Sequence, residues 1–207
     1  MNNRLLLTLA AVIALLAGFW LGQSGTETAQ PQAGQDNSIQ GFILKTPRKI
    51  GVPELIRGDG ELFSLSDLTG HWSLLFYGYT NCPDICPTTL NTIAAAKKQV
   101  DDFPQVVFVS VDPQRDNAQL VGDYVRYFDR DFIGVTGEEK LLQAMAAQMS
   151  VAAMAMPPEK PGDAYLVDHS ANLMLLNPEG RMVAMLRPPH SVDSILHSIN
   201  TVMYREQ

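Results

Sequence analysis

The chain has little cysteine and no excess of basic charge. Only two of its 207 residues are cysteine, so any disulfide, thiol chemistry or thiolate metal site must use this one pair. Lys and Arg number 15 against 22 Asp and Glu, and the formal net charge of −7 disfavours nucleic acid and anionic lipid surfaces as partners. The chain also lacks internal repeats. Its 46% hydrophobic content is enough for one ordinary core, and one domain is expected.

Charged residues are missing from residues 5–21, close to the shortest helix that spans a hydrocarbon core of ~30 Å. One arginine precedes this stretch and no basic residue follows soon, which orients the N-terminus to the cytoplasm. The stretch ends in Phe19, Trp20 and Leu21, without the small residues of a cleavage site. We favour a retained anchor at residues 1–22 over a signal peptide. The rest of the chain is then expected in the periplasm or an equivalent extracytoplasmic space, tied to the inner membrane.

Large apolar side chains are scarce in the segment that follows. Residues 23–40 are rich in Gln, Gly, Ser and Thr, and such a composition cannot offset the entropy cost of ordering the chain. We therefore predict a flexible tether here. The folded domain is expected over residues 41–207.

Apolar patterning in this domain alternates between buried strands and amphipathic helices. The resulting order, β-α-β-α-α-β-β-α, predicts an α/β, thioredoxin-like fold with a central mixed sheet flanked by helices. Asp116 is the expected cap of the second helix, and Ser191 that of the last. The expected strands are residues 73–79, 105–112 and 164–170 with a hairpin at 173–186, and the expected helices are residues 88–100, 116–129, 137–149 and 191–203.

Both cysteines lie where the first of these strands leads into a helix. On a helix, the Cα atoms of Cys82 and Cys86 would be about 6.2 Å apart, which permits either a disulfide or a shared metal. The N–H groups and partial positive charge of a helix start stabilise a thiolate and lower a cysteine pKa. Pro83 and Pro87 hold the loop in shape. A structural disulfide closing so short a loop would stabilise little, so thiol redox chemistry and metal binding are the two favoured functions.

Two thiolates do not complete a metal site, and imidazole is the expected additional donor for copper or zinc. His71, His190 and His197 lie in a turn, a loop and the last helix, where surface or capping roles are expected. His169 differs because it ends an apolar strand beside Asp168, from which a side chain can point toward the helix start. A neighbouring acceptor could hold its second ring nitrogen. A structural histidine at a strand end is the alternative.

Four methionines between positions 145 and 156 invite a copper–thioether interpretation. Met145 and Met149 are four residues apart on an apolar helix face, where core packing is the expected role. Met154 and Met156 fall in an expected loop, where copper ligation is more plausible than on the helix face but is still the less favoured role.

Three segments, "GYTNCPDICPTTL", "VSVDPQRDNAQLVGDYV" and "YLVDHSANLMLLNPEG", resemble the Sco/SenC family of copper chaperones for cytochrome c oxidase assembly. The resemblance extends from about Gly41 to the C-terminus. It implies that Cys82, Cys86 and His169 bind one copper ion, Cu(I) or Cu(II), with Asp112 near the site and no metal contact of its own. It also implies a thioredoxin-like fold, and a mobile loop at "MAMPPEKPGD".

The resemblance further implies partners and a role. The protein would deliver copper to the CuA centre of cytochrome c oxidase subunit II or act with another periplasmic copper chaperone, without being a true enzyme. The alternative is a thiol–disulfide oxidoreductase that keeps the CuA cysteines reduced without metal. In that case Cys82 attacks a target disulfide and Cys86 resolves the mixed disulfide. His169 distinguishes the two, because a reductase needs no histidine there.

Overall fold

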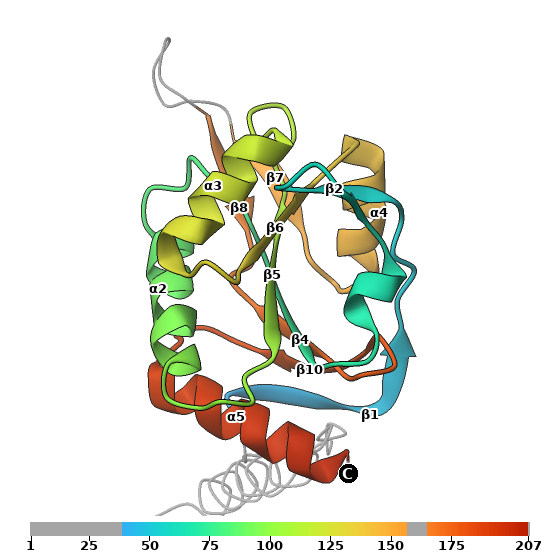
Figure 1. Ribbon diagram of the computed structural model, residues 1–207, viewed down its shortest axis with the longest axis vertical. Coiled ribbons are helices and arrows are strands. Elements are labelled where there is room, and N and C mark those ends of the chain that lie inside the picture. The colour runs from blue at the N-terminus through green and yellow to red at the C-terminus, as the bar shows by residue number, and fades with distance from the viewer. Residues whose placement is uncertain (1–38, 157–164, 207) are drawn as a thin grey trace, which may run out of the picture. The chain divides into compact units, whose positions relative to one another are not determined.

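The computed structural model describes residues 39–156 and 165–206. Its elements are β1 (Gly41–Lys49), β2 (Leu55–Arg57), β3 (Leu62–Phe63), the 3-10 helix η1 (Leu65–Leu68), β4 (Ser73–Gly78), α2 (Ile85–Lys97), β5 (Gln105–Ser110), α3 (Ala118–Phe128), β6 (Ile133–Thr136), α4 (Glu139–Gln148), β7 (Ala153–Met156), β8 (Leu166–His169), β9 (Leu173–Leu176), β10 (Arg181–Leu186) and α5 (Val192–Arg205). The main sheet has the strand order β1-β10-β9-β4-β5-β6-β2-β3 (Figure 1). It is mixed, because β4, β5 and β6 run parallel and the other neighbours antiparallel.

Different helices cover the two faces of this sheet (Figure 1). All six residues of the central strand β4 are buried. Leu74 and Phe76 pack in one cluster with residues of α2, α3 and α5, whereas Leu75 and Tyr77 pack in a second cluster with residues of α4 and η1. Because successive side chains of a strand point to opposite faces, one apolar run fills both halves of the core.

A second sheet contains only β7 and β8, which we call the β7–β8 ribbon. The two strands are antiparallel, with Met156 opposite Leu166 and Ala153 opposite His169. Neither strand pairs with the main sheet. The ribbon leads through a short link into β9, which is the antiparallel neighbour of β4.

The predicted fold class is confirmed by this arrangement. The strands expected at residues 73–79 and 105–112 are β4 and β5, the hairpin expected at residues 173–186 is β9 and β10, and each expected helix is present. Ser191 caps α5 as predicted. The sequence analysis missed β2, β3 and β6 because they have only two to four residues, and β1 because it is an edge strand without a buried run.

Two local expectations are corrected. The cap of α3 is Asn117, whose side chain accepts the Leu120 N–H at 2.9 Å, whereas the expected cap Asp116 is buried and bonded elsewhere. Met154 and Met156 belong to β7, where a loop was expected. Cross-strand pairing with β8, distant in sequence, creates this strand, so the local pattern does not show it.

The predictions for the N-terminus fall outside the described part of the chain. Residues 1–22, the predicted anchor, and residues 23–38 of the predicted tether are not described, and neither are residues 157–164 of the expected mobile loop. Within residues 39–156 and 165–206, the helices are all too short or too polar to cross a membrane.

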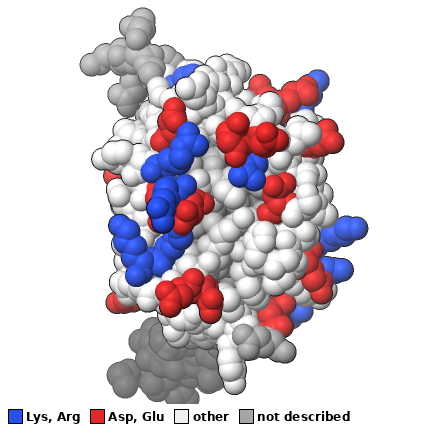
Figure 2. All heavy atoms as spheres, in the orientation of Figure 1, with Lys and Arg blue, Asp and Glu red and all other residues white. Residues whose placement is uncertain are grey.

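The charged surface carries several ion pairs. On the face in Figure 2, acidic side chains stand beside basic ones. Lys97 bridges Asp129 and Asp131, each at 2.7 Å, and Arg126 pairs with Asp123 at 2.5 Å. The Arg126–Asp123 pair is exposed on both sides, and such a pair contributes about 0–1 kcal/mol, so Arg126 is a suitable control position.

Candidate metal site

The end of β4 brings the backbone against the second cysteine. A Cβ added to Gly78 would lie 2.7 Å from Phe108 Cε2 and 2.8 Å from Cys86 Sγ. Only glycine fits at this point, because contacts this short would force the ring or the sulfur to move. The close approach places Cys86 directly behind the central strand, at the start of α2.

The two cysteines are thiols with unequal exposure. Cys82 lies in the turn before α2 and is half-buried, whereas Cys86 is the second residue of the helix and is fully buried. The Cys86 amide donates a hydrogen bond to Cys82 Sγ at 3.3 Å. One of the otherwise unpaired N–H groups of the helix start is thus directed at the more exposed sulfur.

The electrostatics of the buried sulfur are different. The pKa of Cys86 is raised, first by its hydrogen bond with Cys82 and second by burial. For Cys86 the expectation of a lowered pKa from the helix start is therefore wrong. The positive end of a helix is outweighed when the neighbour is a second sulfur and water is excluded. Cys86 keeps its proton more firmly, and any metal that binds it must displace that proton.

The predicted histidine ligand lies in β8, close to this pair in the fold. Val167 is buried in the same cluster as Cys82 and Cys86. Position 169 is two residues further along the strand and therefore on the same face of the ribbon backbone as Val167. Asp168, between them, is exposed. The side chain of His169 is outside the described part of the structure, so the ligand set of two cysteines and His169 stays a prediction. Among the described side chains, no three His, Cys, Asp or Glu form a metal-binding group.

Asp112, predicted near the site, follows β5 and is buried. Its Oδ1 accepts the Tyr165 hydroxyl at 2.6 Å, and its Oδ2 accepts Arg115 Nε at 2.5 Å. Its own amide donates to Ser110 Oγ at 3.0 Å. Both carboxylate oxygens are therefore already engaged by a strand-end tyrosine and an arginine. Sequence reasoning missed Arg115 and Tyr165.

Asp116 is a second residue that sequence reasoning misassigned. Its Oδ1 accepts the Thr80 hydroxyl at 2.6 Å, and its Oδ2 accepts the Thr80 amide at 3.1 Å and the Ser110 hydroxyl at 2.7 Å. Burial is the main cause that raises its pKa. The carboxylate ties the cysteine turn to the end of β5. In the sequence, Asp116 is only an acidic residue shortly after a buried strand. The same pattern fits a helix cap, so the sequence alone does not indicate its bonds to Thr80 and Ser110.

The remaining candidates have other roles. His71 and His197 are exposed, and His190 is half-buried and donates from Nε2 to the Ala171 carbonyl at 2.7 Å. Met145 and Met149 are fully buried in the cluster beside α4, so core packing is confirmed for both. Met156 is exposed on β7, and copper ligation there, the less favoured interpretation, is not tested by the described residues.

Comparison with known proteins gives consistent matches over the folded domain. Residues 45–204 match a family model described as SCO1/SenC. The mitochondrial protein SCO1 homolog 1 of Arabidopsis thaliana is 39% identical over 155 residues, which are 72% of this chain and 46% of that protein. An SCO2-like protein of Rickettsia prowazekii is 36% identical over 158 residues, 73% of this chain and 74% of that protein. This chain thus spans about half the plant protein and three quarters of the bacterial one.

A solved structure supports the same relationship. The crystal structure of Arabidopsis thaliana ScoI with copper bound is similar with a TM-score of 0.70 and 38% sequence identity, covering 76% of this chain and 99% of that chain. This chain therefore shares its fold with a relative whose structure contains copper.

Proposed function

Because the chain belongs to the SCO1/SenC family, we propose that it binds one copper ion through Cys82, Cys86 and His169. Its function is then to deliver copper for assembly of the CuA centre of cytochrome c oxidase. The observation that carries this proposal is the pair of neighbouring thiols, with Cys86 bonded through its amide to Cys82 Sγ, packed in one cluster with a residue of the strand that bears His169.

The chemistry of this donor set suits a metal that must be handed on. Thiolate and imidazole are soft and borderline donors that favour copper or zinc over hard cations. Three protein ligands leave a coordination position open, so a cysteine or methionine of the partner can bind before the first ligand leaves. Cys82 is the more exposed sulfur and is the expected first leaving ligand. Oxidation of the pair to a disulfide removes two electrons and two protons and abolishes both thiolate ligands, which makes binding dependent on redox state.

The expected partner is subunit II of the oxidase, which contains the CuA centre, or another periplasmic copper chaperone. Residues 1–22 would hold the protein at the inner membrane, and residues 23–40 would give the domain reach across the membrane surface. The net charge of −7 favours a neutral or basic partner surface.

The test is copper binding by the reduced full-length chain. Cu(I) and Cu(II) are added to the parent, to Cys82→Ser, to His169→Ala and to the control His197→Ala on the exposed face of α5, and bound copper and visible absorption are measured. We expect one equivalent of copper and a thiolate-to-Cu(II) charge-transfer band in the parent and the control, with no band in Cys82→Ser and a shifted, weaker band in His169→Ala. Equal spectra for His169→Ala and the parent would rule out His169 as a ligand.

A second candidate function is thiol–disulfide exchange without metal. It is favoured by the asymmetry of the pair, because a half-exposed Cys82 beside a buried Cys86 with a raised pKa is the arrangement of an attacking and a resolving thiol. If this is the function, His169→Ala reduces a disulfide of a CuA-type peptide as fast as the parent, while Cys82→Ser is inactive. A rate that falls equally in both variants excludes the metal-independent reaction.

A further inference from the structure

The β7–β8 ribbon needs an attachment that backbone pairing does not supply. Its two strands bond only to each other within the described sheets. A cavity of about 410 Å³ lies beside it, lined by residues of α4, the segment after β5 and the ribbon itself. Close packing therefore does not fix this side of the ribbon. Its position over the cysteines must depend on side chains at a few points.

Arg115 makes one polar attachment at the base of β8, and the Tyr79 side chain makes another by its hydrogen bond with the Val167 backbone. Arg115 Nη1 donates to the Tyr165 carbonyl at 2.9 Å, and its guanidinium carbon lies 3.7 Å from the centre of the Tyr165 ring. Tyr165 immediately precedes β8 and is four residues before His169. Because the guanidinium both stacks on the Tyr165 ring and bonds to its carbonyl, it fixes the position and the orientation of the residue that immediately precedes β8.

The same guanidinium also contacts the cysteine side of the site. Its carbon lies 5.6 Å from the centre of the Tyr79 ring, three residues before Cys82. Its Nε binds Asp112, which in turn accepts the Tyr165 hydroxyl. Arg115 therefore stands between the two chain segments that supply the predicted ligands and contacts both.

We propose that Arg115 is a positioning residue that holds β8 over the cysteine turn and thereby sets how tightly copper is bound. This inference rests on the proposed copper function for its effect on affinity. Arg115 does not touch the metal: it acts through Tyr165 and the backbone of β8 on His169. Its other neighbour, Asp112, keeps the guanidinium oriented through Oδ2, and its Oδ1 accepts the Tyr165 hydroxyl.

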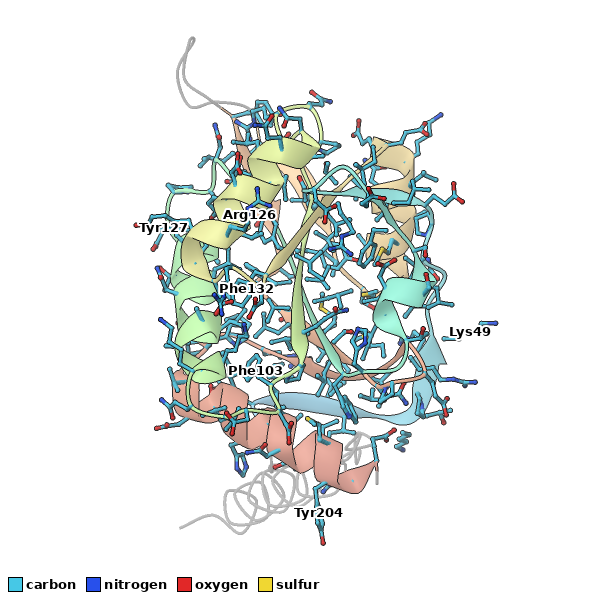
Figure 3. All side chains as sticks on the ribbon, in the orientation of Figure 1. Lys49, Phe103, Arg126, Tyr127, Phe132 and Tyr204 are labelled. Atoms are coloured by element: carbon cyan, nitrogen blue, oxygen red, sulfur yellow. The ribbon has the colours of Figure 1, made fainter. Side chains whose placement is uncertain are left out.

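Arginine is specifically required by this geometry. A lysine retains the positive charge near Asp112, but its ammonium cannot stack on Tyr165 while also donating in the plane to Asp112 and to the Tyr165 carbonyl. Arg115→Lys is therefore the informative substitution. Tyr165→Phe is a milder second variant, which keeps the ring and the carbonyl but loses the hydroxyl bond to Asp112. The control is Arg126→Lys on α3 (Figure 3). The exposed Arg126 side chain pairs only with Asp123 among the described residues.

The first measurement is amide hydrogen exchange of the full-length chain without metal, with β8 compared with β4. In Arg115→Lys we expect the β8 amides to exchange at least about tenfold faster while the β4 amides keep their rates, because the ribbon detaches locally. Tyr165→Phe should show the same change at smaller size, and Arg126→Lys should show none.

The second measurement is Cu(II) affinity by competition with a chelator, in the parent and in the His169→Ala background. Arg115→Lys should weaken binding about 10- to 100-fold, the range found for residues that orient metal ligands. In the His169→Ala background the same substitution should have no further effect, since the residue acts through His169. A merely structural role would weaken binding equally in both backgrounds.

The outcomes separate this inference from the copper proposal. If the parent binds no copper, the copper function fails, and β8 exchange alone decides whether Arg115 holds the ribbon. If Arg115→Lys exchanges like Arg126→Lys and binds copper like the parent, the positioning role is overturned. If Arg115→Lys unfolds, so that β4 and β8 exchange rise together, the inference is decided by Tyr165→Phe: faster exchange confined to β8 supports it, and unchanged exchange overturns it.

Discussion

The two halves of the candidate site are built in different ways. The cysteine half combines a central strand of the main sheet, a turn and the first turn of α2, and its strand is buried on both faces. The histidine half is a two-stranded ribbon outside the main sheet, held by Val167 and by the contacts of Arg115. The difference shows that the two cysteines are part of the core, whereas the third predicted ligand lies on the β7–β8 ribbon, which is attached to the core by side chains. Metal affinity can then change without loss of the fold.

The largest expected effect is a difference in local stability within the parent protein. The β4 amides should exchange only through global unfolding, whereas the β8 amides should exchange through detachment of the ribbon, at a free energy lower by roughly 3 kcal/mol or more. Native-state hydrogen exchange, followed by mass spectrometry of peptides from each strand, measures both. Equal protection of β4 and β8 would show that the ribbon unfolds with the core, and the two halves of the site would then not differ in stability.

The second prediction breaks the cysteine half at its polar anchor. Asp116→Ala leaves three buried or half-buried donors of Thr80 and Ser110 without their acceptor and should lower the free energy of unfolding by about 3 kcal/mol. Urea unfolding followed by circular dichroism is the measurement. Asp123→Ala, which removes an exposed ion pair, should change stability by less than about 1 kcal/mol. A loss of the same small size at Asp116 would mean that the turn is held by its backbone alone.

The third prediction crowds the same half from inside. Gly78→Ala places a methyl group against Phe108 and Cys86 Sγ and should cost about 2 kcal/mol of stability, with altered reactivity of the buried thiol. Thiol labelling and urea unfolding report the two effects. Gly51→Ala is the control, because the atom nearest its added Cβ is the flexible end of Gln148 at 3.3 Å. Equal stability of the two variants would contradict close packing at Gly78.

The cysteine half could be predicted from sequence because its signals are local. A continuous apolar run, two cysteines four residues apart and apolar residues at helical spacing placed Cys82 and Cys86 at the strand–helix junction. The fold class followed from the order of such segments. The raised pKa of Cys86 could not be anticipated, because it depends first on the hydrogen bond with Cys82 and second on burial behind Gly78, which only the packed structure shows.

The histidine half was less predictable because its supports are distant in sequence. Arg115 and Tyr165 are 50 residues apart, and nothing near either residue indicates that they stack. Asp116 satisfied the local rule for a helix cap, but Thr80 and Ser110 compete for it across the fold. The strand β7 exists through pairing with β8. In each case a long-range contact overrode a reasonable local interpretation.

The smallest predicted effect concerns the end of the ribbon link opposite Arg115. His190 donates to the carbonyl of Ala171, two residues after His169, and burial lowers the pKa of its imidazole. The unfolded state, with a histidine pKa near ~6.5, then binds more protons than the folded state, so this histidine favours the folded state above that pH and loses the effect as pH falls toward its folded pKa. His190→Gln should remove this dependence. Because the side chain is only half-buried, the parent should lose less than about 1 kcal/mol relative to the variant between about pH 7.5 and 5. Urea unfolding at several pH values measures the difference. If the free energies of unfolding of the two proteins change in parallel with pH, His190 does not contribute to the pH dependence of stability.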